Sequence, residues 1–157
     1  MINNTYISNT ADFGNDISSY ATRIKRVVNG TELVDVYEFN DIPSGIVIDQ
    51  PIELAVVSSE QNTIMTNDNS SPIKFEAFET GTRVRGQNID TLYRGRAVFT
   101  NTIFIAKPGQ KNVQFKLSSL AVNYAVLQFL DPVKYADQII SVNFRWCKPG
   151  EIEVGDT

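Results

Sequence analysis

The segment from Tyr93 to Ser119 constrains the fold of this chain more than any other. Its sequence, YRGRAVFTNTIFIAKPGQKNVQFKLSS, predicts two β-strands joined by a turn. Pro108-Gly109 supplies the turn, because proline presets φ and glycine accepts a positive φ. In the strand after it, Val113, Phe115 and Leu117 alternate with polar residues, so one face is buried and the other is wet. This pattern is typical of a hairpin in a β-sandwich.

Strand patterns continue along most of the chain from Ser19. The runs SYATRIKRVV and ELVDVYEF flank Asn29-Gly30, and Asn-Gly between two such runs is a strong hairpin signal. Pro51 lies inside the next run and marks an edge, a bulge or a switch between sheets, because proline cannot donate to a ladder. The runs PIKFEAFE, TRVR and IISVNFRW also predict strands, and in the last of them Ile140, Val142, Phe144 and Trp146 share one face.

One segment departs from the strand pattern. Val122, Ala125, Val126 and Phe129 stand at helical spacing, which predicts at most one short helix near residues 120–130, ended by Asp131-Pro132. A long connection with a helical turn is the alternative.

Seven or eight short strands with turns between them predict an all-β fold. We expect an antiparallel two-sheet, immunoglobulin-like β-sandwich, with a jelly roll as the main competitor. The sandwich is expected over residues 19–147. Residues 1–18 are expected to be a flexible leader or an edge strand, and residues 148–157 a C-terminal tail or linker.

Composition excludes several kinds of chemistry. The 157 residues contain one cysteine and no histidine, which excludes Ser-His-Asp and Cys-His mechanisms and the common zinc sites within this chain. The net charge of −4 is unlike that of a nucleic-acid binder. No apolar run is long enough for a transmembrane helix, so no direct membrane insertion is expected. The start of the chain lacks the pattern of a signal peptide, which predicts a cytoplasmic protein or a piece of a longer secreted chain. No cofactor and no metal are expected.

The sequence offers few candidate sites. Asn3, Asn29 and Asn69 each begin an Asn-X-Ser/Thr sequon and are candidate N-glycosylation sites. The lone Cys147 is either a buried structural thiol or a partner for a cysteine outside this segment. The larger aromatic residues are interpreted as core, namely Phe75, Phe99, Phe104, Phe115, Phe144 and Trp146. A sugar-binding platform would need exposed rings, and Phe78, Tyr93 and Phe104 are the candidates.

Two groups of residues carry a family resemblance. The pattern GRAVF…IFIAKPG…VQFKLSS resembles the immunoglobulin-like repeats of the filamin and invasin kind, and Gly95, Ala97, Phe99, Pro108 and Gly109 are the matching positions. The segment SVNFRWCKPGE is similar to a junction in very large ciliate surface proteins, where such a domain ends in Phe-Arg-x-Cys-x-x-Gly-Glu and a cysteine-rich, growth-factor-receptor-like segment begins. Phe144, Arg145 and Cys147 match that junction, with Gly150 and Glu151 after them.

The resemblance implies a non-enzymatic structural or adhesion module of a larger extracellular or cell-surface protein. Its partners would be neighbouring domains or identical subunits, and Cys147 would pair with the adjoining segment. It also implies that Thr102 and Phe104 face inward, although Ala97 and Phe99 share a parity with Ile103 and Ile105. That arrangement requires a one-residue bulge near Asn101. Two other functions stay open, a carbohydrate-binding module and a jelly-roll coat or capsid-type subunit.

Overall fold

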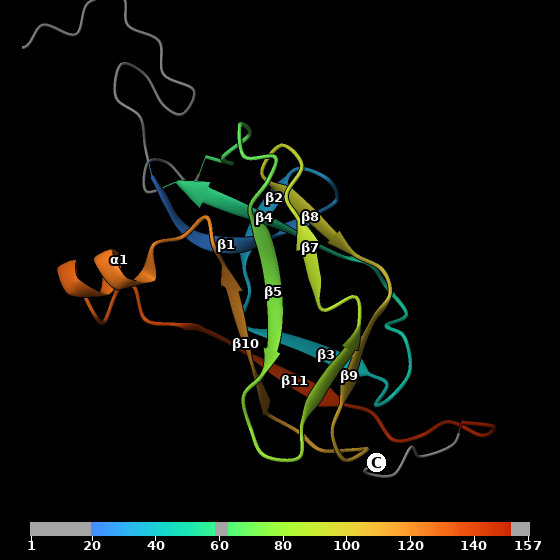
Figure 1. The fold of residues 1–157 in the computed structure, drawn as a ribbon. Coiled ribbons are helices and arrows are strands. Elements are labelled where there is room, and N and C mark those ends of the chain that lie inside the picture. Colours follow the sequence, from blue (N-terminus) through green and yellow to red (C-terminus); the bar gives the residue numbers. More distant parts are fainter. Residues whose placement is uncertain (1–19, 59–62, 152–157) are drawn as a thin grey trace, which may run out of the picture.

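The computed structural model describes residues 20–58 and 63–151 of the chain. These residues form eleven strands and one helix (Figure 1). In chain order they are β1 (Ala21–Val28), β2 (Glu32–Asp35), β3 (Glu38–Ile42), β4 (Ile52–Ser58), β5 (Pro72–Ala77), β6 (Arg83–Gly86), β7 (Ile89–Thr91), β8 (Arg96–Phe99), β9 (Thr102–Ile105), β10 (Val113–Ser119), α1 (Tyr124–Leu130) and β11 (Gln138–Phe144).

The strands form two large sheets and one small one. The four-stranded sheet has the order β2-β1-β4-β8, the five-stranded sheet β3-β11-β10-β5-β7, and β6 pairs with β9. Every pair of these strands is antiparallel except β3 and β11, which run parallel. The prediction of an all-β sandwich with one short helix is confirmed.

The Asn-Gly hairpin is also confirmed. β1 and β2 pair antiparallel up to Val28 and Glu32, and Asn29 and Gly30 connect them with φ of 52° and 77°. Glycine and asparagine tolerate this left-handed conformation better than other residues.

The run ELVDVYEF was predicted as one strand but supplies two. β2 ends at Asp35 in the four-stranded sheet, and β3 begins at Glu38 in the five-stranded sheet. Val36 lies between them and is buried. Such divisions raise the number of strands above the expected seven or eight.

The hairpin predicted across Pro108-Gly109 is wrong. β9 pairs with β6, whereas β10 pairs with β5 and β11, so the Pro-Gly turn joins two different sheets. Alternation along a strand reports which face is buried, but it does not report which strand lies alongside.

The change of inward parity that the predicted bulge near Asn101 requires is observed. Ala97 and Phe99 are buried in β8, and Thr102 and Phe104 are buried in β9, so the inward parity changes between the two strands. The change occurs over two exposed residues, Thr100 and Asn101.

Gln87 holds this bend through both its side chain and its backbone. Its Oε1 accepts the N–H groups of Thr100 (2.9 Å) and Asn101 (3.3 Å), and its Nε2 donates to the Val98 carbonyl (2.9 Å). The Gln87 N–H donates to the Asn101 carbonyl (2.8 Å). The hydroxyl of buried Thr102 donates to the Gln87 carbonyl. No feature of the sequence pattern had singled out Gln87.

A row of phenylalanine rings occupies the core between the sheets. Phe104 lies 5.3 Å from Phe75 and 5.1 Å from Phe115 between ring centroids, both in edge-to-face geometry. Phe99 packs against Phe75 at one end of this row, and Phe144 packs against Phe115 at the other. The core interpretation is therefore right for all five of these rings.

Trp146 is the exception, because it is 73% exposed. β11 ends at Phe144, so the alternation that predicted a buried Trp146 stops before that residue. Its indole ring lies against Gly109, where a Cβ would overlap the ring.

The helix α1 lies within residues 120–130, where a short helix was predicted, and it ends before Asp131 as the Asp131-Pro132 pair predicts. The Asn123 side chain accepts the N–H of Val126, and Asp131 follows the last helical residue. Leu127 is the buried residue of this helix, whereas Val126 and Phe129, two of the residues at helical spacing, are exposed. Figure 1 shows α1 (orange) at the side of the sandwich, outside both large sheets.

Candidate functional site

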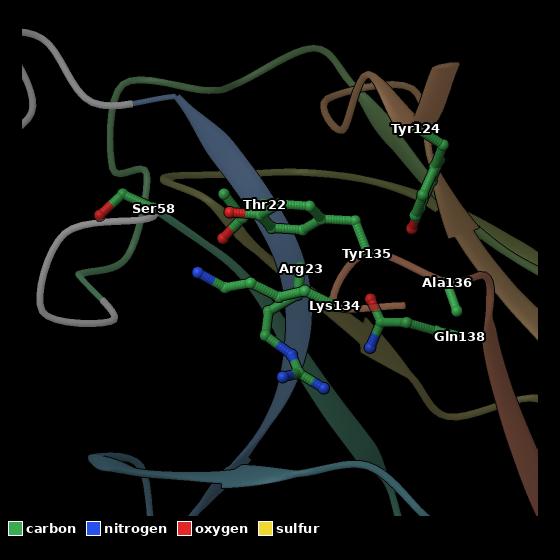
Figure 2. Close-up of a pocket in the computed structure, with 8 residues that line it drawn as sticks. All are labelled: Thr22, Arg23, Ser58, Tyr124, Lys134, Tyr135, Ala136 and Gln138. Atoms are coloured by element: carbon green, nitrogen blue, oxygen red, sulfur yellow. The ribbon is translucent and has the colours of Figure 1, made fainter. Parts of the chain in front are cut away.

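A small cavity lies beside α1, where the start of β1 meets the chain between α1 and β11. It has a volume of about 150 Å³. Figure 2 shows the eight residues that line it, which are Thr22, Arg23, Ser58, Tyr124, Lys134, Tyr135, Ala136 and Gln138. They come from both large sheets and from the connection that carries α1, so only the folded chain brings them together.

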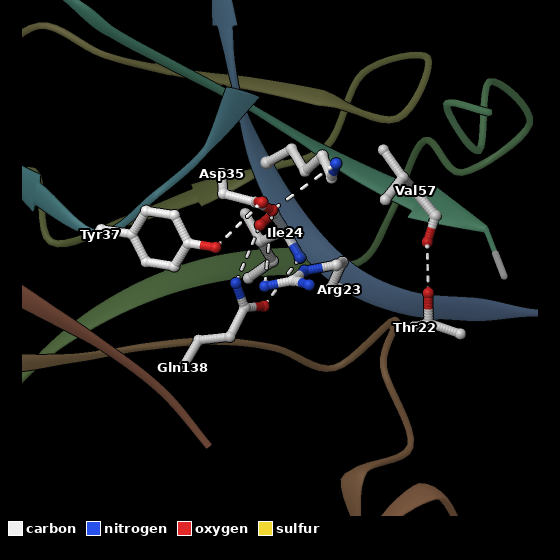
Figure 3. Close-up of polar contacts among 8 residues, drawn as sticks. Thr22, Arg23, Ile24, Asp35, Tyr37, Val57 and Gln138 are labelled. Atoms are coloured by element: carbon white, nitrogen blue, oxygen red, sulfur yellow. Dashed lines mark hydrogen bonds and ion pairs between the residues drawn. The ribbon is translucent and has the colours of Figure 1, made fainter. Parts of the chain in front are cut away.

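Gln138 fixes one wall of this pocket and ties the two sheets together. Its Nε2 donates to the Ile24 carbonyl (2.9 Å), and its Oε1 accepts the Ile24 N–H (2.8 Å), as Figure 3 shows. Gln138 begins β11 in one sheet and Ile24 lies in β1 of the other. Because both ends of the amide are used in this way, its orientation is set.

A charged cluster borders the pocket on β1 and β2 (Figure 3). Asp35 lies 3.5 Å from the Arg23 guanidinium and 3.6 Å from the Lys25 ammonium, and it accepts a hydrogen bond from the Tyr37 hydroxyl (3.1 Å). Burial raises the pKa of the Asp35 carboxyl, but the Tyr37 hydrogen bond and the two cations outweigh burial and lower it. The carboxylate therefore stays ionised. Arg23 still has a buried Nε without a hydrogen-bond partner among the described residues.

Tyr124 places its hydroxyl in the same pocket. That hydroxyl is buried and has no hydrogen-bond partner in the described part of the chain. The Ser119 backbone is near enough to influence the Tyr124 pKa, but it makes no hydrogen bond with the hydroxyl. Burial, with the negative charge of Asp137, raises the pKa of Tyr124 to about 12. The hydroxyl is therefore protonated at neutral pH and has a proton to donate.

A second surface feature is an exposed apolar patch on α1 and its flanks, here called the α1 patch. Phe129 is 88% exposed and Val133 87% exposed. The other members are also more than half exposed, and they are Leu120, Val126 and Leu130. In the sequence, the helical spacing of Val126 and Phe129 was the available signal of this apolar face.

A groove runs beside the α1 patch. It has a volume of about 590 Å³ and is lined by residues that include Ile89 of edge strand β7, Leu120, Val122 and Tyr124. Leu120 belongs both to the groove and to the α1 patch, so the two surfaces adjoin.

The C-terminal motif forms a closed loop, here called the C-terminal clasp. The Arg145 guanidinium makes two hydrogen bonds of 2.7 Å with the Glu151 carboxylate, and that carboxylate also accepts the Lys148 N–H (2.8 Å). The Arg145 hydrogen bond is the main reason why the pKa of Glu151 falls to about 2. Cys147 is free and exposed inside this loop, so the alternative of a buried structural thiol is wrong.

The positions that carry the family resemblance occupy turns and core. Gly95 has φ of 74°, and a Cβ there would collide with the Met65 carbonyl. Ala97, Phe99 and Phe144 are buried in the core. Pro108 is also buried, and Gly109 has φ of 77° where it meets Trp146.

The sequons differ in their surroundings. Asn29 is exposed in the β1–β2 turn. Asn69 is exposed, but its amide is used locally, since Nδ2 donates to the Asn67 carbonyl (3.3 Å) and Oδ1 accepts the Arg94 N–H (2.8 Å). Asn3 lies outside the described residues.

The three candidate rings for a sugar platform do not come together. Phe104 is fully buried, whereas Phe78 and Tyr93 are exposed. Phe78 follows the last residue of β5. Tyr93 lies near the other end of β5, because it follows shortly after Thr91, which pairs with Pro72, the first residue of β5. Six residues of extended strand separate these ends by about 20 Å.

Within residues 20–58 and 63–151, no group of three or more acidic or cysteine side chains is arranged to hold a metal ion. No helix in the same residues is long and apolar enough to cross a membrane. Comparison with protein-family models, curated proteins and solved structures finds no match to this chain.

Proposed function

We propose that this chain is a non-enzymatic structural or adhesion module of a larger extracellular or cell-surface protein, and that it acts by contact with identical subunits or neighbouring domains. The α1 patch is the observation that carries this proposal. Exposed apolar residues scattered singly are normal, but a contiguous group is a mark of an interaction surface. α1 buries one residue and exposes its remaining apolar residues, so its apolar surface is available to a partner.

An identical subunit is the partner that the shape of this side favours. A raised apolar ridge beside an apolar groove is self-complementary, because a twofold axis can place each ridge in the groove of the other copy. Phe129 and Val133 would supply the ridge, and Ile89 with Val122 would line the groove.

The C-terminal clasp supports placement within a larger chain. Arg145 and Glu151 close a short loop that presents the Cys147 thiol to solvent. This is a suitable position for a disulfide with an adjoining segment, as the resemblance to the ciliate surface-protein junction implies.

The two other functions have less support. A carbohydrate-binding module would need a ring platform, and the candidate rings lie apart. A jelly-roll coat subunit would have two four-stranded sheets, whereas the described strands form sheets of four, five and two. If the protein is cytoplasmic, the C-terminal clasp would present a reduced thiol and contact through the α1 patch would still apply.

Sedimentation velocity of the full 157-residue chain tests the contact surface. Over about 1 to 200 µM, which covers weak interfaces, we expect the wild type to associate. The double variant Phe129→Ser/Val133→Ser should remain monomeric. The matched control is Phe78→Ser, which changes an exposed ring on another part of the surface and should associate like the wild type. A wild type that stays monomeric throughout, or a double variant that still associates, contradicts self-association through the α1 patch.

A further inference from the structure

The pocket of Figure 2 is separate from the α1 patch in its chemistry, because its walls carry hydrogen-bond donors that the protein leaves unused. The Tyr124 hydroxyl and the Arg23 Nε are both buried without a partner among the described residues. The Lys134 ammonium makes no ion pair with a described residue, and its nearest recorded contact is the Tyr135 ring, 5.2 Å from the ring centroid. In Figure 2 the Tyr124 hydroxyl points toward the centre of the lining residues.

The acceptors near these donors do not satisfy them. Asp35 accepts the Tyr37 hydroxyl and lies 3.5 Å from Arg23 and 3.6 Å from Lys25, but its buried Oδ1, like the Arg23 Nε, has no hydrogen-bond partner among the described residues. The amide of Gln138 is taken up at both ends by Ile24.

The other carboxylate near Tyr124, that of Asp137, also has partners of its own. Asp137 accepts from the Gln128 amide (2.9 Å) and lies 3.5 Å from the Lys116 ammonium. A buried donor that stays unpaired is costly, which favours a ligand that brings its own acceptor oxygens.

Charge and size restrict that ligand further. Arg23 and Lys134 line the pocket and no described carboxylate does, although the chain carries a net charge of −4. A volume of about 150 Å³ accommodates one small group. Burial strengthens hydrogen bonds between cationic donors and an anion.

We propose that this pocket binds a small oxyanion, a carboxylate or a phosphate group, either free or at the end of a larger ligand. Arg23 and Lys134 supply the positive charge, and the Tyr124 hydroxyl donates to one oxygen. The pKa of Tyr124 is raised to about 12. Its hydroxyl is therefore protonated at physiological pH, where a carboxylate or phosphate is ionised. Gln138 contributes by holding the two sheets at a fixed separation.

The test uses the full chain and two probes, inorganic phosphate and acetate, at constant low ionic strength. Backbone amide shifts of Thr22, Arg23, Ala136 and Gln138 report occupancy of the pocket. Two variants remove one group each. Tyr124→Phe deletes only an unpartnered hydroxyl, and Lys134→Met removes the charge of an exposed side chain, so both should fold. Lys107→Met is the control, because Lys107 is exposed and does not line the pocket.

We expect saturable shifts confined to the pocket, with each of the two variants weakening binding about tenfold, the value of one charge-assisted hydrogen bond or ion contact. The Lys107→Met protein should bind like the wild type. Tighter binding of phosphate than of acetate would identify the phosphate group as the ligand chemistry, and the reverse order a carboxylate. The proposal is overturned if neither probe produces saturable shifts up to roughly 50 mM, a range that covers millimolar affinity. It is also overturned if the two variants bind as the wild type does, since the shifts would then report general ion condensation.

Discussion

Replacing Phe104 by alanine is the sharpest test of the core and of its strand register. The Phe104 side chain has no solvent exposure, and its ring meets those of Phe75, Phe115 and Phe39 at centroid distances of 5.3, 5.1 and 6.4 Å. Removal of a buried phenylalanine ring costs about 3–5 kcal/mol through lost transfer free energy and the cavity that remains. We expect a loss near the middle of that range, about 4 kcal/mol, because three rings border the cavity and keep it from collapsing.

This loss is large beside the total stability of a domain, which is about 5–15 kcal/mol. For a chain of this length it should lower the melting temperature by about 8–16 °C. The measurement is urea unfolding followed by far-ultraviolet circular dichroism. Fluorescence of Trp146 would be a poor probe of the core because that ring is exposed. An unchanged slope of free energy against urea would show that the loss lies in the folded state.

Ile103→Ala is the matched control, since it removes an apolar side chain from the neighbouring, partly exposed position of β9. We expect it to cost much less than Phe104→Ala. If Ile103→Ala costs more, the inward parity of β9 is the opposite of that described, and the reasoning about the bend held by Gln87 is refuted.

Three further outcomes follow from local geometry. Gly86→Ala should destabilise the fold by at least about 1 kcal/mol more than Gly81→Ala in the same urea assay. Both glycines have positive φ, but of the two only Gly86 would bring a Cβ into collision with an opposing carbonyl. Equal losses of stability would contradict this. Glu151 should titrate near pH 2 when its side-chain carboxyl carbon is followed by NMR, and Arg145→Met should move the midpoint toward the ordinary value of 4.5. Because the pKa of Glu151 is lowered in the folded state, the stabilisation from the C-terminal clasp is present above about pH 4.5 and is lost as the pH falls through about 2. A wild-type midpoint near 4.5 would show that the clasp does not form in solution. Cys147 should react with an aromatic disulfide reagent in the native state as fast as in urea, whereas a thiol protected until unfolding would contradict its exposure.

Local signals in the sequence predicted the elements whose causes are themselves local. The turn at Asn29-Gly30 depends on two residues that accept positive φ, and α1 ends before Asp131-Pro132. The alternating runs also identified most strands and the phenylalanine core. Each of these features is determined by residues a few positions apart.

The features that the sequence did not predict all involve a partner far away along the chain. The strands on either side of Pro108-Gly109 belong to different sheets. One wall of the pocket depends on the contact between Ile24 and Gln138, which stand 114 positions apart. Cys147 illustrates both levels, because the sequence shows that it is the single cysteine and the structure shows that it is exposed.

The sequence by itself determined an all-β chain with one short helix, the positions of its tight turns, and the absence of histidine chemistry. The tertiary structure decided which strands pair, that Phe104 faces inward while Trp146 faces solvent, and that Val126, Phe129 and Leu130 of α1 stay exposed. The physical reason is that periodicity shows which side chains share a face. Burial of that face depends on what the rest of the chain packs against it.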